Sequence, residues 1–153
     1  MNMKKYMNLL TLCIMTFFVS NVNSIMAQNR GQARAFLNRT NKVIMKAKGS
    51  VNVGQVYTGD LVKAVYHQKF ARSLYKDGKY TRAIHHSSRS RALAFAAIKA
   101  NKHEVAKEME LQKDEQALVK GQPDNNFLDA EVEIPKDADD KSVMQIKEDD
   151  VKE

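Results

Sequence analysis

Adjacent histidines and serines are the residues in this sequence whose types could do chemistry. The run His-His-Ser-Ser occupies residues 85–88, and an imidazole beside a hydroxyl is the pairing that activates a serine nucleophile. On a helix, however, neighbouring side chains point about 100° apart. This spacing alone therefore supplies neither a general base nor a pair of metal ligands, which would stand three or four residues apart. His67 and His103 could approach in three dimensions, but nothing in the sequence requires it. We expect no catalytic residue, no metal site and no cofactor.

Basic side chains are the other candidate for chemistry, because they gather on the flanks of two neighbouring segments. Stripes of this kind bind phosphates, anionic lipid headgroups or acidic polysaccharide, and they also occur as solvated surface. No aromatic stacking platform or recognition-helix motif accompanies them, so nucleic acid is the least expected partner. Together with the unusual Arg91, the candidate partner-binding or anion-binding residues are Lys69, Arg72, Lys76, Arg82, Arg89 and Arg91.

Arg91 stands where an apolar side chain is expected. Its position on a helix over 79–101 places it among large apolar residues. Because an unpaired guanidinium is costly to bury, either its stem lies along apolar surface with the charged end in water, or a carboxylate meets it. The candidate carboxylates are Asp60, Asp77 and the acidic residues near the C-terminus.

Helices are expected to position these side chains. Apolar residues recur with helical periodicity over four segments, the last of them weaker: 30–48, 61–77, 79–101 and 103–119. The run at 49–59 interrupts the pattern and favours a loop. Asp60 is expected to cap the second helix, because its carboxylate can accept the free amide protons of the first turn. Gly78 is expected to end that helix in the left-handed conformation.

A row of small side chains follows one face of the third segment. The row consists of Ala83, Ser87, Ser90, Ala94 and Ala97. At helical spacing these residues fall within about 80° of arc, and small side chains let the backbone of another helix approach closely. The row therefore predicts one arm of a tight antiparallel helix pair.

The stretch FARSLYKDGKYTRAIHHSSRS, residues 70–90, resembles a tetratricopeptide repeat. The matching residues are Phe70, Ala71, Leu74, Gly78, Tyr80 and Ala83. Ser87 and Ser90 depart from the pattern, since the family has a large aromatic residue and an alanine there, and no proline closes the unit. No second copy follows at the 34-residue period, whereas a stacked array needs three or more. The resemblance implies one helical hairpin, about residues 67–90, and protein binding in a helical groove.

Charge divides the chain after the expected helices. Residues 28–120 carry 19 Lys and Arg against 7 Asp and Glu, whereas residues 121–153 carry 4 against 11. This composition predicts an acidic, mostly disordered tail, although four apolar residues could anchor it to the helices: Phe127, Leu128, Val132 and Ile134. The tail either folds back and screens the basic face, or the two parts meet different partners, or both are solvated surface.

The first residues have the layout of a secretory signal peptide. Lys4 and Lys5 precede an apolar run over 9–19, and small polar residues follow it. That run is too short to span a bilayer, which takes about 20 helical residues. Cleavage is expected after Ala27, with Ser24 as the alternative. Since the one cysteine lies inside this leader, the exported chain would contain no disulfide and no thiolate metal site.

The 153 residues therefore divide into a signal peptide (1–27), a helical domain (28–120) and an acidic tail (121–153). Six glycines and two prolines are few for a many-turned β-sandwich, so we expect an all-α fold, a small antiparallel bundle of three or four helices. The expected function is a non-catalytic protein–protein interaction or scaffold module of the bacterial envelope, periplasmic or extracellular. The alternative is a basic-faced binder of anionic surfaces or polyanions, such as lipid headgroups, acidic polysaccharide or nucleic acid.

Overall fold

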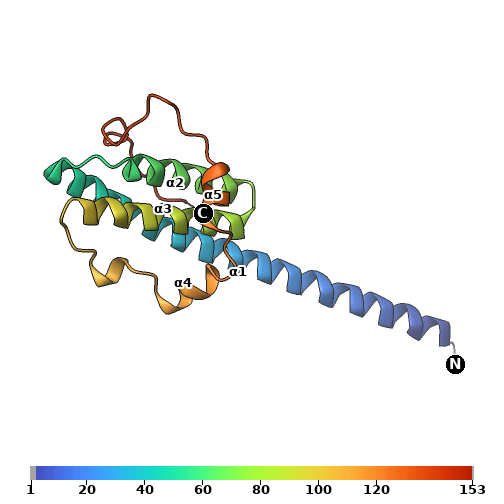
Figure 1. Cartoon of the computed structure of the whole chain (residues 1–153). Coiled ribbons are helices and arrows are strands. Elements are labelled where there is room, and N and C mark those ends of the chain that lie inside the picture. The colour runs from blue at the N-terminus through green and yellow to red at the C-terminus, as the bar shows by residue number, and fades with distance from the viewer. Residues whose placement is uncertain (1–2, 153) are drawn as a thin grey trace.

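The computed structural model describes the backbone of residues 3–152 and the side chains of residues 29–152, and these residues form helices joined by loops, without a strand among them. The helices are α1 (Met3–Gly54), α2 (Asp60–Lys76), α3 (Tyr80–Ala100), α4 (Lys113–Leu118) and α5 (Asn125–Ala130), with a 3-10 turn at Lys107–Met109. Figure 1 shows α2 and α3 packed side by side along the C-terminal part of α1, with the rest of the chain returning over them. The expected all-α class is confirmed.

The first helix runs further than its apolar periodicity predicts. We expected a break at Gly49, but α1 continues to Gly54 because Ser50 and Val51 are buried against the other helices. The helix ends where Gln55 takes a left-handed φ of 55°. Asn101, at the end of α3, holds this turn, since its side-chain amide exchanges hydrogen bonds with both the amide and the carbonyl of Val56, at 2.9 and 3.0 Å.

The start of α2 is capped by a residue that the sequence analysis did not select. The carboxylate of Asp60 accepts a hydrogen bond from Thr58, not from the amides of its own helix. Asp140 of the acidic tail accepts instead from Val62 in the first turn and from Gly59 just before the helix, at 2.8 Å each. The prediction that Asp60 is the cap is wrong, because a carboxylate 78 residues after Val62 in sequence binds the amide of Val62.

Replacing Asp140 with alanine is expected to lower the free energy of unfolding by about 1–2 kcal/mol, as for other lost helix caps. Asp137→Ala is the matched control, since it removes the same charge from an exposed tail position. Urea unfolding followed by circular dichroism measures both. If Asp60→Ala costs as much as Asp140→Ala, the assignment of the cap to Asp140 is wrong.

The small-residue row of α3 is buried, as expected. Its five residues are at most 1% exposed, and α3 packs against both α1 and α2. Ser90 also donates a hydrogen bond to the carbonyl of Ala64 on α2, at 2.6 Å. The turn between α2 and α3 contains Gly78 with φ 75°, so the predicted end of α2 is confirmed.

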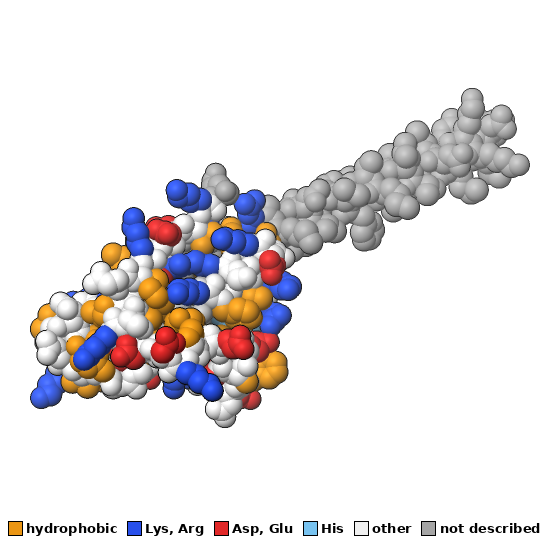
Figure 2. Space-filling model, turned by 90° about the horizontal axis from the view of Figure 1, so that it is seen from above, with side chains coloured by type: hydrophobic (Ala, Val, Ile, Leu, Met, Phe, Trp, Pro, Cys, Tyr) orange, Lys and Arg blue, Asp and Glu red, His pale blue; other side chains and the backbone are white. Residues whose placement is uncertain are grey.

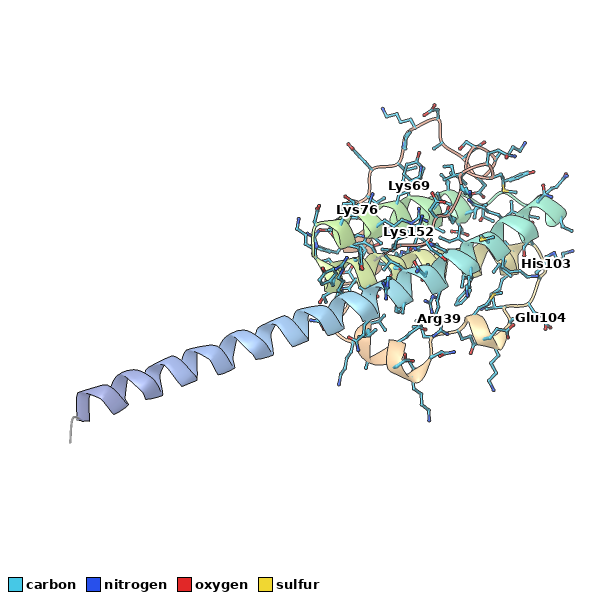
Figure 3. All side chains as sticks on the ribbon, turned by 180° about the vertical axis from the view of Figure 1, so that it is seen from behind. Arg39, Lys69, Lys76, His103, Glu104 and Lys152 are labelled. Atoms are coloured by element: carbon cyan, nitrogen blue, oxygen red, sulfur yellow. The ribbon has the colours of Figure 1, made fainter. Side chains whose placement is uncertain are left out.

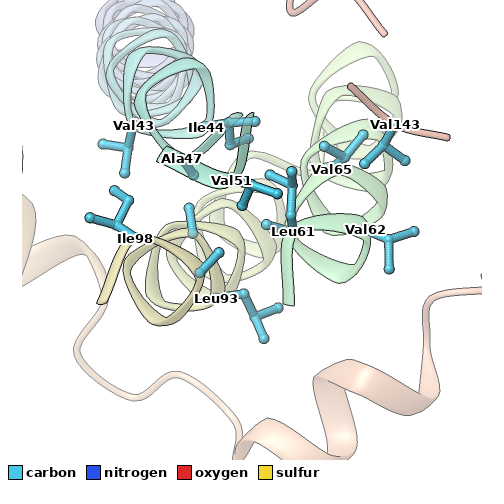
Figure 4. Close-up of a cluster of buried hydrophobic side chains, with 13 residues drawn as sticks. Val43, Ile44, Ala47, Val51, Leu61, Val62, Val65, Leu93, Ile98 and Val143 are labelled. Atoms are coloured by element: carbon cyan, nitrogen blue, oxygen red, sulfur yellow. The ribbon is translucent and has the colours of Figure 1, made fainter. Parts of the chain in front are cut away.

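Apolar residues from all three long helices form the core. Figure 4 shows side chains of this cluster from each of these helices, among them Val51 of α1, Leu61 of α2 and Ile98 of α3. Val143 joins the same cluster from the acidic tail and is only 1% exposed. The tail thus contributes a side chain to the core.

The segment after α3 differs from its prediction. A helix over 103–119 was expected, but the described chain forms only the 3-10 turn and α4 there. Lys102 takes a left-handed φ of 57°, which stops α3. The helix α4 begins where the side chain of Glu115 accepts a hydrogen bond from the amide of Gln112, at 3.1 Å. The weak apolar periodicity of this stretch does not sustain one long helix.

The acidic tail follows a defined path over the helices through residue 152, so the predicted disorder is not confirmed. Leu128 is 2% exposed and Val143 is 1% exposed, whereas Phe127, another predicted anchor, is 56% exposed. Several apolar residues of the tail pack on the helices, among them Leu128, Val143 and the predicted anchor Ile134. Together with several ion pairs, these contacts offset the entropy lost by ordering this segment. The amino-acid composition of the tail does not predict these contacts, because it does not specify which residues meet the helices.

Among the helices that the structure describes, none combines the length and the apolar character that crossing a membrane requires. The expected signal peptide, residues 1–27, lies outside the residues whose side chains are described.

Candidate functional site

Three of the six candidate cations are paired with carboxylates of the acidic tail. Arg89 binds Asp129 through two hydrogen bonds, at 2.8 and 2.7 Å. Arg82 binds Glu131 at 2.6 Å, and Arg72 binds Glu148. On the face shown in Figure 2, Asp and Glu side chains accordingly lie among the Lys and Arg side chains. The tail folds back over the basic face, which is one of the alternatives that the charge distribution left open.

Arg91 is buried and paired, and its partner is Glu115 of α4. The guanidinium donates to both carboxylate oxygens, at 2.8 and 3.0 Å, and also to the hydroxyl of Thr40, at 3.1 and 3.0 Å. It also lies over the ring of Phe36, 4.4 Å from the centroid. The arginine is 2% exposed. Asp60, Asp77 and the tail carboxylates, the partners proposed from the sequence, do not fill this role, so Arg91 belongs to the core.

The two candidate lysines stay on the surface. Lys69 lies 4.6 Å from the centre of the Tyr66 ring, and Lys76 borders a cavity of about 640 Å³. Figure 3 shows Lys152 near Lys76, on the side where the end of the chain crosses the helices. The structure therefore does not bring the six candidates into one cluster: Arg91 lies in the core, Arg82 and Arg89 bind Glu131 and Asp129, and Arg72 binds Glu148 near the end of the chain.

A groove between α1 and α2 holds the end of the chain, and the sequence analysis missed it. We call residues 146–152 the C-terminal segment. Asn38 on α1 exchanges two hydrogen bonds with the backbone of Val151: it accepts from the amide at 2.7 Å and donates to the carbonyl at 3.2 Å. Asn41, one turn further, donates to the carbonyl of Asp149 at 3.0 Å. Two asparagines three residues apart on one helix face are the signal that could have drawn attention to it.

Charged side chains bind the same segment in the middle of the groove. The carboxylate of Glu148 lies between Lys48, at 3.1 Å, and Arg72, and its side chain has no exposed surface. Lys48 also donates to the carbonyl of Ile146. Glu148 is therefore enclosed by one lysine and one arginine, one from each wall of the groove.

A second cluster joins α2 and α3 to the tail through two histidines. Nδ1 of His67 lies 3.2 Å from Nδ1 of His86, and the rings are stacked. Nε2 of His67 is 3.1 Å from Asp129, and Nε2 of His86 is 2.9 Å from Glu131. Both rings are at most 1% exposed. The result is a row of carboxylate, imidazole, imidazole and carboxylate, which only tertiary packing assembles.

Burial keeps both rings uncharged. It lowers the pKa of His67 to about 4, and nearby His86 lowers it further while Asp129 opposes the shift. Burial also lowers the pKa of His86, although the hydrogen bond with Glu131 acts in the opposite direction. The Arg89 guanidinium lowers the pKa of Asp129. The lowered pKa values favour uncharged rings at neutral pH, and two uncharged rings supply two N–H protons for the three contacts of the row.

The run at 85–88 does not assemble a nucleophile in the structure. Ser87 is fully buried, and its hydroxyl has no hydrogen-bond partner among the described residues. His86 instead contacts His67 and Glu131. Within residues 29–152, no group of three His, Cys, Asp or Glu side chains is placed to hold a metal ion.

Comparison with known proteins found no relative of this chain. No protein-family model, no curated protein and no solved structure matches this chain.

Proposed function

We propose that the protein is a non-catalytic protein–protein interaction module, exported to the periplasm or cell surface, whose basic face binds an acidic polypeptide segment. The observation that carries this proposal is the pairing of Arg82 and Arg89 with Glu131 and Asp129 of the acidic tail. This pairing supports a polypeptide ligand, because two carboxylates at fixed positions along one chain reach both arginines.

The α2–α3 hairpin supports the same function. It contains the residues that resemble a tetratricopeptide repeat, and its second helix, α3, supplies both arginines. We propose that this single hairpin acts as such repeats do, by presenting a helical surface to a protein partner. Paired charges and a half-buried segment are also the contacts that specify a partner at moderate affinity.

The alternative function, binding of anionic surfaces, is favoured by Lys69 and Lys76, which stay exposed beside the paired arginines. The two functions differ in whether the ligand must present its charges in a fixed order. A lipid surface or polysaccharide offers charge without a fixed order of side chains, whereas the tail combines Asp129 and Glu131 with the buried apolar residue Leu128. Dependence on peptide sequence therefore separates the two functions.

The test uses the full chain carrying Asp129→Asn and Glu131→Gln, which weakens the tail's hold on Arg82 and Arg89. A labelled peptide copying residues 121–135 is expected to bind this variant at least about tenfold tighter than the natural chain, because a tethered competitor has been weakened. The double variant Glu133→Gln/Asp137→Asn removes the same charge from exposed positions and should bind like the natural chain. Equal binding of a scrambled peptide, together with tight binding to phosphatidylglycerol vesicles, would instead establish the anionic-surface function.

A further inference from the structure

The groove between α1 and α2 recognises an extended peptide by its backbone. Its asparagines and Lys48 bind the amide or carbonyl of Ile146, Asp149 and Val151. Backbone hydrogen bonds of this kind give affinity to any extended segment, while the pockets between them select side chains. The same two-way contact of an asparagine amide with a peptide unit holds Val56 against Asn101, but there it closes an internal turn.

The groove side chains are also held by contacts that do not involve the segment. Gln68, which is fully buried, donates to the side-chain oxygen of Asn41 at 2.7 Å, and Arg72 donates to the same oxygen at 3.1 Å. With its oxygen engaged by α2, the amide group of Asn41 turns its N–H bonds toward the segment. Such support fixes the binding geometry.

Two pockets define the side chains that the groove accepts. One encloses Glu148 between Lys48 and Arg72. The other receives Val151, which packs on the apolar cluster that includes Phe36 and Tyr75. Asp149, between them, is exposed. The groove thus selects a glutamate followed three residues later by an apolar side chain in an extended, acidic peptide.

The segment itself is attached in a way that allows it to leave. Its residues form no helix, and Asp150 and Lys152 are exposed. The tail is anchored upstream, by Val143 in the core and by Asp140 on α2, so release of the segment leaves those contacts intact. The segment also leaves part of the groove unfilled while it is bound. The 640 Å³ cavity beside Val151 is bordered by Tyr75 and Arg72, and the Tyr75 hydroxyl and the Arg72 Nε find no hydrogen-bond partner within the described residues.

We propose that this groove is the binding site for an extended acidic peptide of a partner protein, of the form Glu-x-x-apolar, and that the C-terminal segment is an internal competitor which the partner displaces. This inference rests on the proposed function, since it assumes an interaction module, but it concerns a different surface from the Arg82 and Arg89 contacts. The cavity that the segment leaves unfilled favours a partner over a second copy of the same segment.

The experiment measures binding of a fluorescein-labelled peptide copying residues 144–153 to three full-length proteins by fluorescence anisotropy. The first is the natural chain, and the second carries Glu148→Ala and Val151→Asp, which empties the groove. The third adds Asn38→Ala to that pair. We expect the second to bind the peptide at least about tenfold tighter than the first, because a tethered competitor acts at an effective concentration near millimolar. The third is expected to lose this gain, as is a peptide carrying the same two substitutions.

Each other outcome contradicts the proposal. Equal binding to the first two proteins, or a gain that survives Asn38→Ala, shows that the groove does not bind the peptide. Dimers of the natural chain in analytical ultracentrifugation that the Glu148→Ala/Val151→Asp variant lacks show that the occupant is a second copy. Far-UV circular dichroism checks that the variants fold. If the 121–135 peptide binds its variant while the 144–153 peptide binds none, this inference fails and the proposed function stands.

Discussion

Replacing Glu115 with alanine is expected to lower the free energy of unfolding by about 3–5 kcal/mol, the largest effect of any single substitution considered for this protein. The change leaves the guanidinium of Arg91 buried, with only Thr40 and the carbonyl of Phe36 as acceptors. Removing one member of a buried ion pair costs more than the pair itself contributes, because the remaining charge stays desolvated. Urea unfolding monitored by circular dichroism gives the value.

Two controls show whether the effect comes from the unpaired charge. Arg39 lies 3.5 Å from the same carboxylate but is 29% exposed, so Arg39→Ala is expected to cost less than about 1 kcal/mol. The double variant Arg91→Met/Glu115→Leu removes both charges and should recover most of the stability that Glu115→Ala loses. A double variant as unstable as Glu115→Ala would mean that packing, not charge, sets the cost.

Acidification from pH 6.5 to about 4 is expected to lower the free energy of unfolding by roughly 3 kcal/mol through His67 alone. The folded pKa of this ring is about 4, below its usual value of 6.5. Between those pH values the unfolded chain therefore binds a proton that the folded chain does not, and stability is lost as the pH falls. His85 and His86 act in the same direction, since burial lowers the pKa of each.

The groups around His67 define the matched variants. It faces His86, Asp129 and Arg89, and Asp129 contributes with the usual sign of a carboxylate, so its share is lost only at lower pH. His67→Phe keeps a ring of similar size without a titrating nitrogen and should flatten the pH dependence between 6.5 and 4. His103→Gln, which changes a histidine outside this cluster, should leave it unchanged. A slope that persists in His67→Phe would assign the pH dependence to other groups.

Local patterns predicted most of the helical framework. The segments 61–77 and 79–101 are helices within one residue at each end of their predicted bounds, because apolar periodicity and the glycine turn at 78 act over a few residues. The buried row that includes Ser90 was also predicted, because small side chains at helical spacing allow another helix to pack closely against them. The prediction failed at 49–54 and 103–119, where packing against distant residues extends one helix and leaves the other broken.

The candidate site was predictable only in part. The sequence showed which residues carry positive charge and that an acidic segment follows them. It did not show that Arg89 meets Asp129, or that Asn38 meets Val151, 113 residues later in the chain. Nor did it show the pairing of His67 with His86, since these residues lie 19 positions apart on two helices that are joined by a turn.

The helical class, the α2–α3 hairpin and the split of charge between helices and tail follow from the amino-acid order alone, since backbone preference and hydrophobic spacing operate between near neighbours. Tertiary structure decided which carboxylate meets which cation, whether the tail is ordered, and what fills the groove. Those outcomes depend on side chains far apart in sequence, because the packing of the helices and the tail sets the distance between the charges of each ion pair and their exposure to water.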